Sequence, residues 1–222
     1  MSDYSTLESR ILEMLADSGA ASFTTDLVAE SLQRALDEYS QYNPNSAEAL
    51  IDLPGDGWEI ALNNVTGLLR VMAVHWPYDS ALAEIDQHPN QVKNFVLWWD
   101  DAQPVITIET EDNSMPETDD EVRIWYEKAQ TIEGLGAGTI TSLPEHHESM
   151  LVTGAAGFAA MSKSAEMMLG TDTDMYGTTL VATWGSAKQK EFRAQLKLLA
   201  RQIGYSGRQR GSWTMDKSDR IY

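Results

Sequence analysis

Up to residue 43, apolar and polar positions follow the period of an amphipathic helix in two successive stretches. Apolar residues recur three or four positions apart, and charged residues fill the positions between them. Gly19 offers a left-handed end to the first helix, and Thr24 and Thr25 offer hydroxyl caps to the second. We therefore expect two short antiparallel helices, the second of which ends at Asn43-Pro44-Asn45. Their apolar positions are Leu7, Ile11, Met14, Leu15, Val28, Leu32, Ala35, Leu36 and Tyr39.

From about residue 51 to residue 130 the period changes to two, which is typical of β-strands. Turn-forming sequences such as Pro54-Gly55-Asp56-Gly57 separate the strand-like stretches, and no pattern of helical length lies between them. We therefore expect one antiparallel sheet of about five short strands, inserted between helices. The five stretches are 58–62, 68–76, 95–99, 105–110 and 122–126.

Helical periodicity returns after Leu143-Pro144, where proline suits a first helical position. The run from Gly154 to Ala160 consists almost entirely of small residues, which suits a helix that another backbone approaches closely. After a break at 170–177, we expect a last helix from about Thr178 to Ile203. Its apolar side includes Trp184, Phe192 and Leu196, and its other faces carry Lys188, Lys190, Arg193, Lys197 and Arg201.

Residues 205–222 combine glycines, basic residues and large apolar side chains without a sustained period. Such a segment cannot bury its own apolar residues, so it either stays disordered or docks along a partner. The predicted fold class is therefore α+β, with a helical bundle of about four helices, an inserted antiparallel β-sheet and an extended C-terminal tail. We expect the domain boundaries to be 1–48 for the N-terminal helix pair, 49–142 for the β region, 143–204 for the C-terminal helices and 205–222 for the tail.

Composition narrows the class of protein further. The chain has 222 residues and no cysteine, which excludes disulfides, thiolate metal sites, iron–sulfur clusters and cysteine nucleophiles. No apolar run approaches the roughly 20 residues of a membrane-spanning helix, and the start Met1-Ser2-Asp3-Tyr4 lacks the pattern of a signal peptide. We therefore expect a soluble protein, made in the cytoplasm, with no membrane partner.

Charge is distributed unevenly along the chain. The formal net charge is −18, which argues against binding of phosphate backbones over the whole surface. Residues 188–222 carry nine Lys and Arg against three Asp and Glu, a net charge of +6, whereas residues 1–187 carry a net charge of −24. The chain thus has an acidic region and a basic region. Such a charge asymmetry bears on what the protein binds more than on how it folds.

Signals for enzymatic chemistry are weak. His146 and His147 are adjacent, so on a helix they point about 100° apart and do not form the i, i+4 pair of a zinc site. The stretch 134–138 lacks the Lys-Ser/Thr of a phosphate-binding loop, and the acidic stretches 100–101 and 109–121 suit a solvated surface. We therefore expect no enzyme, no cofactor and no metal site. A metal-dependent nuclease or esterase, and a nucleic-acid-binding module that acts through the basic C-terminus, remain as alternatives.

Several motifs follow one another in a fixed order over most of residues 7 to 160. They are Leu7-x-x-Arg10-Ile11-Leu12, Phe23-Thr24-x-x-x-Leu27, Arg34-Ala35-Leu36-x-Glu38-Tyr39, Leu68-x-Arg70-Val71-x-x-Val74-x-Trp76-Pro77-Tyr78, Val122-Arg123-Ile124-Trp125-Tyr126 and Leu143-Pro144-x-x-His147-Glu148-x-x-Leu151-Val152. In order and spacing, this set resembles the head-to-tail connector (adaptor) proteins of tailed phages.

The resemblance implies a structural role in the neck of a virion. Such adaptors have a helical bundle with an inserted β-sheet and form a ring, typically of twelve copies, beneath the portal vertex. The implied partners are the portal protein, a tail or terminator protein below the ring, and genomic DNA that passes without specific binding. A tail terminator or stopper ring protein is an alternative within the same class. We also expect that acidic residues line the channel, against the alternative that they only confer solubility.

Two groups of residues are candidates for contacts in such a ring. Closure of a ring requires a heterologous interface, for which the small-residue helix and the aromatic strands are candidates. The predicted subunit-interface residues are Gly154, Ala155, Phe158, Trp98, Trp99 and Trp125. The tail combines charge with apolar anchors, and a C-terminal segment commonly inserts into the portal in this family. The predicted portal-binding residues are Arg208, Arg210, Trp213, Met215, Ile221 and Tyr222.

Overall fold

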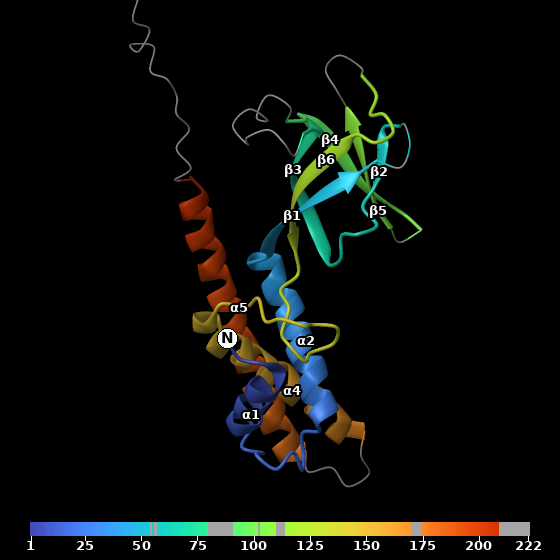
Figure 1. The fold of residues 1–222 in the computed structure, drawn as a ribbon. Helices are drawn as coiled ribbons and strands as arrows, with labels where there is room; N and C mark the ends of the chain where they lie inside the picture. The colour runs from blue at the N-terminus through green and yellow to red at the C-terminus, as the bar shows by residue number, and fades with distance from the viewer. Residues whose placement is uncertain are drawn as a thin grey trace, which may run out of the picture. The chain divides into compact units, whose positions relative to one another are not determined.

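The chain folds into two compact units, one helical and one built of strands (Figure 1). The structure, a computed structural model, describes residues 1–53, 55, 57–79, 91–101, 103–109, 114–169 and 175–208, with side chains as far as residue 202. Of these, residues 1–43, 133–137 and from 143 onward form the helical unit, and residues 44–132 and 138–142 form the β unit. The predicted α+β class is confirmed.

The helical unit is organised around one buried helix. Its helices are α1 (Tyr4–Met14), α2 (Thr25–Tyr42), α4 (Glu148–Leu169) and α5 (Met175–Arg208), and a short 3-10 helix, η2 (Glu145–His147), leads into α4. Residues from Met150 to Ala160 of α4 are buried without a break, because α1, α2 and α5 all pack against this helix (Figure 1). The expected four helices are thus present.

Capping residues explain where the first two helices begin. The Asp3 carboxylate accepts a hydrogen bond of 3.0 Å from the Thr6 amide at the start of α1, and the Thr24 hydroxyl accepts one of 3.3 Å from the Leu27 amide at the start of α2. Each bond satisfies an amide that has no partner within its helix. The predicted hydroxyl cap at Thr24 is confirmed.

The end of α1 differs from the prediction. The left-handed residue is Ala16, with φ of 56°, and the helix has already ended at Met14, so the predicted left-handed end at Gly19 is wrong. The amides of Ala16 and Asp17 donate to the carbonyls of Glu13 and Leu12, which is the Schellman arrangement. The Asp17 carboxylate then accepts three backbone hydrogen bonds from residues 21–23, which lower its pKa, the bond from Phe23 most strongly.

Small residues let α4 and α5 approach closely. A Cβ added to Gly157 would lie 2.9 Å from the backbone nitrogen of Gln189, and one added to Gly185 would lie 3.0 Å from the carbonyl oxygen of Gly157. The separation at Gly157 is shorter than real Cβ contacts, so only glycine fits there without a shift of the backbone, and the separation at Gly185 is tighter than nearly all real Cβ contacts. The interpretation of the small-residue run as a site of close helix packing is therefore confirmed.

The described residues of the β unit form two antiparallel sheets of three strands each. One sheet has the order β1 (Asn45–Asp52), β6 (Glu121–Lys128), β3 (Leu68–Tyr78), and the other has the order β2 (Glu59–Ala61), β5 (Gln103–Glu109), β4 (Asn94–Asp100). The predicted antiparallel β region of about five short strands is confirmed, but its six described strands form two sheets instead of one. Strand β1 was missed because its inward-facing positions before Ile51 are Asn45, Ala47 and Ala49, which give only a weak apolar alternation in the sequence.

The two sheets share one apolar core. Strand β6 shows the alternation that builds it, with Val122, Ile124 and Tyr126 buried between residues of the opposite face. Branched side chains of the second sheet, among them Ile60, Ile106 and Ile108, complete the same cluster. The β unit therefore has a hydrophobic core of its own.

The last helix is longer than predicted. Helix α5 continues to Arg208, so the expected boundary between residues 204 and 205 falls inside a helix. The predicted tail residues Arg210, Trp213, Met215, Ile221 and Tyr222 lie outside the described residues. None of the helices in the described part of the chain combines the length and apolarity needed to cross a membrane.

Candidate functional site

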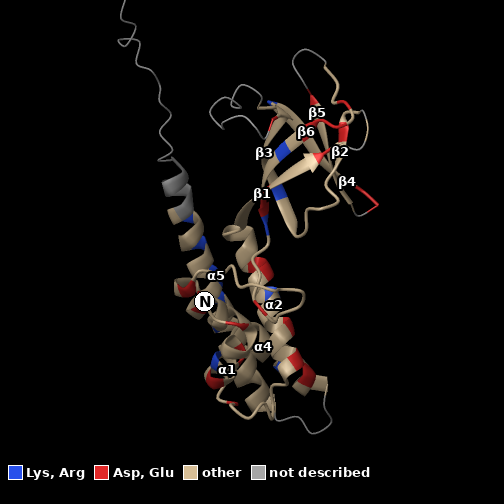
Figure 2. Ribbon diagram, viewed as in Figure 1, with Lys and Arg blue, Asp and Glu red and all other residues tan. Residues whose placement is uncertain are grey.

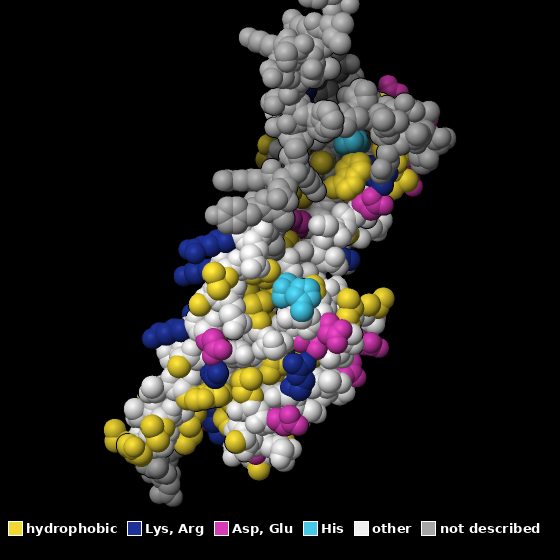
Figure 3. Space-filling view, turned by 90° about the vertical axis from the view of Figure 1, so that its left-hand side faces the viewer, with side chains coloured by type: hydrophobic (Ala, Val, Ile, Leu, Met, Phe, Trp, Pro, Cys, Tyr) yellow, Lys and Arg dark blue, Asp and Glu magenta, His cyan; other side chains and the backbone are white. Residues whose placement is uncertain are grey.

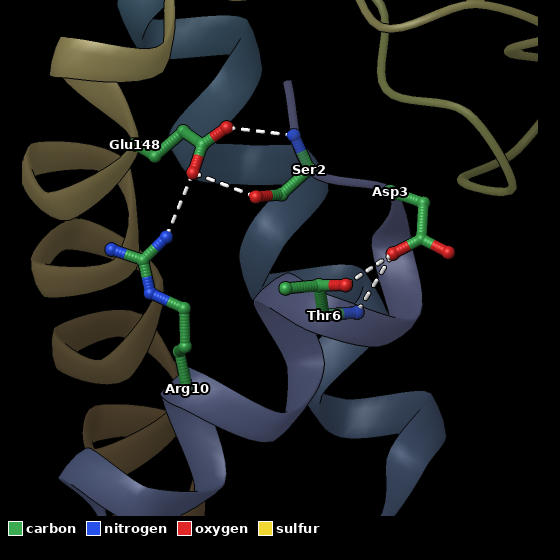
Figure 4. A network of polar contacts seen from close by, with 5 residues as sticks. All are labelled: Ser2, Asp3, Thr6, Arg10 and Glu148. Atoms are coloured by element: carbon green, nitrogen blue, oxygen red, sulfur yellow. Dashed lines mark hydrogen bonds and ion pairs between the residues drawn. The ribbon is translucent and has the colours of Figure 1, made fainter.

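A buried carboxylate joins the N-terminus of the chain to α4 (Figure 4). Glu148 is 3% exposed and accepts hydrogen bonds of 2.8 Å from the Ser2 amide, the Ser2 hydroxyl and an Arg10 guanidinium nitrogen. Burial raises the pKa of Glu148, but the Ser2 and Arg10 hydrogen bonds outweigh burial, so the net shift is downward. Two residues of the same chain thus supply three donors to this carboxylate, which favours a structural role for it.

A second polar cluster lies where α2 meets η2. The Tyr39 hydroxyl lies 2.6 Å from Nδ1 of His147, and the Asn43 side-chain amide donates to the same hydroxyl oxygen. Which of the Tyr39 hydroxyl and Nδ1 donates in this hydrogen bond is set by the tautomer of the His147 ring. Burial, and next the charge of His146, lower the pKa of His147, which favours the neutral form of the ring. Across the described residues no group of three His, Asp or Glu side chains is placed to hold a metal ion.

The structure places the predicted interface residues of α4 inside the helical unit. Ala155 is fully buried, Phe158 is 6% exposed, and a Cβ on Gly154 would lie 2.8 Å from the Phe192 ring of α5. The rings of Phe158 and Phe192 pack edge to face with centroids 6.5 Å apart. These residues hold the helical unit together, and their part in a contact between copies of the chain stays a prediction.

The three predicted interface tryptophans lie in the β unit. Trp98 and Trp99 are neighbours on β4 and therefore point to opposite faces of the sheet. Trp98 is half-buried and donates a hydrogen bond of 3.0 Å to Thr107, whereas Trp99 is 56% exposed. Trp125 lies on the outer face of β6, under the Arg123 guanidinium at 4.8 Å from the ring centroid. Their part in a subunit contact also stays a prediction.

The basic residues of α5 fall into two groups. Arg193 binds Glu38 of α2 at 2.7 Å, and Lys188 binds Glu191 at 2.9 Å. Lys190, Lys197 and Arg201 are exposed and have no ion-pair partner among the residues that the structure describes. Figure 2 shows Lys and Arg recurring along α5 and Asp and Glu along α2, and in Figure 3 a row of Lys and Arg projects along one edge of the helical unit.

A group of exposed apolar side chains was missed by the sequence analysis. These residues, here called the hairpin patch, lie at the end of α4 and the start of α5 and are each more than half exposed (Figure 3, bottom of the view). Their signal in the sequence is a pair of short apolar runs, 167–169 and 175–176, the second of which lies inside the stretch that was interpreted as a break. The hairpin patch consists of Met168, Leu169, Met175, Tyr176 and Leu180.

An apolar groove continues from the hairpin patch. It has a volume of about 350 Å³ and lies between the end of α1 and the helices α4 and α5. Leu180 belongs to both the groove and the patch, so the two form one apolar surface. The other residues that line the groove are Met14, Leu15, Ala16, Phe23, Ala160, Val181 and Trp184.

Comparisons with known proteins place the chain only loosely. No known protein family matches the sequence, and no curated protein matches it. Among solved structures, a similar chain occurs in "Neck of native GTA particle computed with C12 symmetry". It shares 16% sequence identity at a TM-score of 0.28, and the match covers 83% of this chain and 91% of that chain.

Proposed function

We propose that this protein is a structural subunit of a tailed-phage virion, a head-to-tail connector of the neck. Its copies would form a ring that docks on the portal and extends the DNA channel toward a tail or terminator protein. The observation that carries the proposal is the insertion of the β unit between α2 and α4 of the helical unit. This is the layout implied by the motifs between residues 7 and 160, which resemble those of connector proteins.

Exposed apolar surface supports a role in assembly. Monomeric proteins seldom leave several large apolar side chains exposed side by side, because their burial is worth roughly 25 cal/mol per Å². The hairpin patch and the groove beside it form such a surface. We propose that the protein acts through contacts of this kind and catalyses no reaction. The acidic surplus of the chain would keep passing DNA from binding to the channel wall.

The first experiment measures assembly. Negative-stain imaging and native mass determination of the purified protein, alone and with portal particles, should show a ring of identical subunits on the portal. Because α5 extends to Arg208, a truncation that tests the tail must leave the chain intact up to that residue. We expect a chain that lacks residues 209–222 to keep its helical content and to lose binding to the portal. Unchanged binding of the truncated chain to the portal would contradict the proposed role of the tail.

A second candidate function is nucleic-acid binding, which the unpaired cations of α5 favour. Lys190, Lys197 and Arg201 lie on one face of the helix and could contact successive phosphates. DNA binding through three such contacts would weaken steeply as salt increases. Gel-shift titrations of duplex DNA at 50 and 200 mM salt test this candidate. If the protein is a connector, we expect no binding to DNA at 200 mM salt.

A further inference from the structure

Strand β2 has one edge without a neighbouring strand. It is outermost in its sheet, with β5 on its inner side. The Leu62 amide, directly after β2, donates a hydrogen bond of 2.8 Å to the carbonyl of Pro104, so the backbone of Leu62 turns toward β5. Every second residue of an antiparallel strand turns its backbone groups toward the same partner. Glu59 and Ala61 therefore direct their N–H and C=O groups away from β5, toward the open edge of β2.

Strand β1 has an open edge as well. It is outermost in the other sheet, beside β6. The Leu53 amide, directly after β1, donates a hydrogen bond of 3.0 Å to the carbonyl of Asp120, directly before β6. By the same alternation Leu50 and Asp52 direct their N–H and C=O groups away from β6. Among the described residues no backbone hydrogen bond joins β1 to β2.

Residues from the end of β1 and from β2 line one groove in the β unit. It has a volume of about 340 Å³, within the range of roughly 300 to 1,000 Å³ that is usual for binding sites. Its apolar lining consists of the buried side chains of Ile51, Leu53 and Ile60. The exposed residues Asp52 and Glu59 bring two carboxylates to the same groove. The groove thus has an apolar floor and an acidic rim.

An extended peptide segment fits these features. Its backbone would hydrogen-bond to the free N–H and C=O groups of the two open edges, as in other strands that are added to a sheet. Successive side chains of a strand point to opposite faces, so one set would lie over Ile51 and Ile60 and the other beside Asp52 and Glu59. The first set has to be apolar to cover the floor. The second set is best cationic, because opposite charges on neighbouring strands attract.

Charge distinguishes between the possible occupants. Residues 44–132 carry 17 Asp and Glu against four Lys and Arg, a net charge of −13, and Figure 2 shows acidic residues around β2. Neither Asp52 nor Glu59 forms an ion pair with another described residue. A second copy of β1 or β2 would bring the same acids together, which like-charge repulsion disfavours. A cationic segment of a different protein is therefore favoured.

We propose that the groove binds an extended segment of another protein, in which Lys or Arg alternates with apolar residues, as an added strand beside β1 and β2. Backbone groups of Glu59 and Ala61 hold the main chain of the segment, and the carboxylates of Asp52 and Glu59 pair with its cations. Because β2 has three residues, a segment of about five residues is long enough to pair with it. The proposal concerns the β unit alone and does not depend on a ring.

A synthetic peptide tests the alternation. The probe is fluorescein-labelled Lys-Ile-Lys-Val-Lys-Ile-Lys, added to the full-length protein in 150 mM salt and followed by fluorescence anisotropy. The control peptide Lys-Lys-Ile-Val-Ile-Lys-Lys has the same composition and charge, but as a strand it does not separate cations from apolar side chains. We expect the control to bind at least tenfold more weakly. Equal binding would show a general attraction of cations to an acidic protein and would overturn the proposal.

Proline substitutions test the open edge. Ala61→Pro removes an amide at the edge of β2 without removing a hydrogen bond to β5, because the Ala61 N–H is directed away from that strand. We expect affinity for the probe to fall at least tenfold. Ser46→Pro removes an amide from the open edge of β1 outside the groove and should leave binding unchanged. Unchanged binding by Ala61→Pro, with the fold intact by circular dichroism, would contradict the added strand.

Charge reversal tests the acidic rim without altering the backbone, and it decides the question if Ala61→Pro fails to fold. Asp52→Lys combined with Glu59→Lys should weaken binding of the probe at least tenfold. The control Asp100→Lys with Glu109→Lys makes the same change in charge at exposed positions of the β unit outside the groove, and we expect less than a twofold effect. An equal loss in both double variants would overturn the proposal.

The same variants identify other occupants. If the unmodified protein self-associates and Ala61→Pro abolishes the association, a second copy fills the groove and the proposal fails. It also fails if a peptide of residues 209–222 binds as tightly as the probe and loses its affinity in Ala61→Pro, because the chain's own C-terminal segment is then the occupant. None of these results bears on the connector function, which imaging of the ring on portal particles tests separately.

Discussion

The helical unit and the β unit handle charge in opposite ways. In the β unit both arginines are paired, Arg70 with Glu127 and Arg123 with Glu48, and Arg123 also lies 4.8 Å from the centroid of the Trp125 ring. The helical unit instead holds a hydrogen-bonded carboxylate, Glu148, in its interior and leaves Lys190, Lys197 and Arg201 exposed on α5 without an ion-pair partner among the described residues. The arginines of the β unit are thus neutralised within that unit, whereas part of the basic surface of α5 is not.

Apolar surface follows the same division. Exposed apolar residues of the β unit are scattered, with Met72 on β3 and Val96 and Trp99 on opposite faces of β4. Those of the helical unit gather in the hairpin patch and continue into the groove. Because clustered apolar residues mark contact surfaces more reliably than single ones, the helical unit is the better place to look for partners.

The largest effect is expected in the core of the β unit. Ile106 is fully buried between the sheets, so Ile106→Ala should lower the free energy of unfolding of that unit by about 2 to 5 kcal/mol. The control Val96→Ala lies on the paired strand, where the side chain is 61% exposed, and should change it by less than about 0.5 kcal/mol. Hydrogen exchange followed by mass spectrometry measures each unit separately. Equal loss of protection in the helical unit would show that the two units do not fold independently.

The next effect concerns the buried carboxylate of the helical unit. Glu148→Gln removes the charge that Ser2 and Arg10 neutralise, so we expect a loss of about 1.5 to 3 kcal/mol in urea unfolding at pH 7. Glu13→Gln, on the exposed face of α1, is the matched control and should have little effect.

Acid should weaken this contribution in a defined direction. The pKa of Glu148 in the folded protein lies below its ordinary value of 4.5. The stabilisation is therefore complete above about pH 4.5 and is lost as the pH falls through the lower pKa of the folded state. The difference between the unmodified protein and Glu148→Gln should shrink over that range. A difference that stays constant down to pH 3 would contradict the hydrogen-bonded charge as its cause.

The third effect measures how tightly α4 and α5 are packed. A methyl group at Gly157 would meet the Gln189 backbone at 2.9 Å, which side-chain rotation cannot relieve. We expect Gly157→Ala to cost about 1 to 3 kcal/mol of stability despite the better helix propensity of alanine. Gly19→Ala is the control, since nothing lies within 4 Å of a Cβ there. If both changes have the same small effect by urea unfolding, the close approach of the helices is not a constraint.

How much the sequence predicted depends on whether a feature is local. The helices and most strands follow from the spacing of apolar residues, and the Thr24 cap follows from its hydroxyl. Strand β1 did not, because only its pairing with β6, such as Glu48 opposite Trp125, holds it in the sheet. The division into two sheets likewise depends on partners distant in sequence.

The basic surface of α5 could likewise be predicted only in part from the sequence. The sequence gives the basic residues of α5, and their helical spacing is visible there. It does not show that Arg193 is neutralised by Glu38, which is 155 positions away, while Lys190 and Lys197 are not. These relations come from tertiary packing, so local pattern alone could not identify the surface.

The smallest expected effect is a gain in stability at the end of α1. Ala16 holds a left-handed φ of 56°, which costs a residue with a Cβ roughly 1 kcal/mol or more, and glycine adopts it freely. Ala16→Gly should therefore stabilise the helical unit by about 0.5 to 1 kcal/mol in urea unfolding, after allowance for the added freedom of the unfolded chain. Ala21→Gly, a neighbouring residue without a left-handed φ, should be neutral or slightly destabilising. A loss of stability in Ala16→Gly would mean that the methyl group of Ala16, which lines the apolar groove, contributes more by packing than its backbone conformation costs.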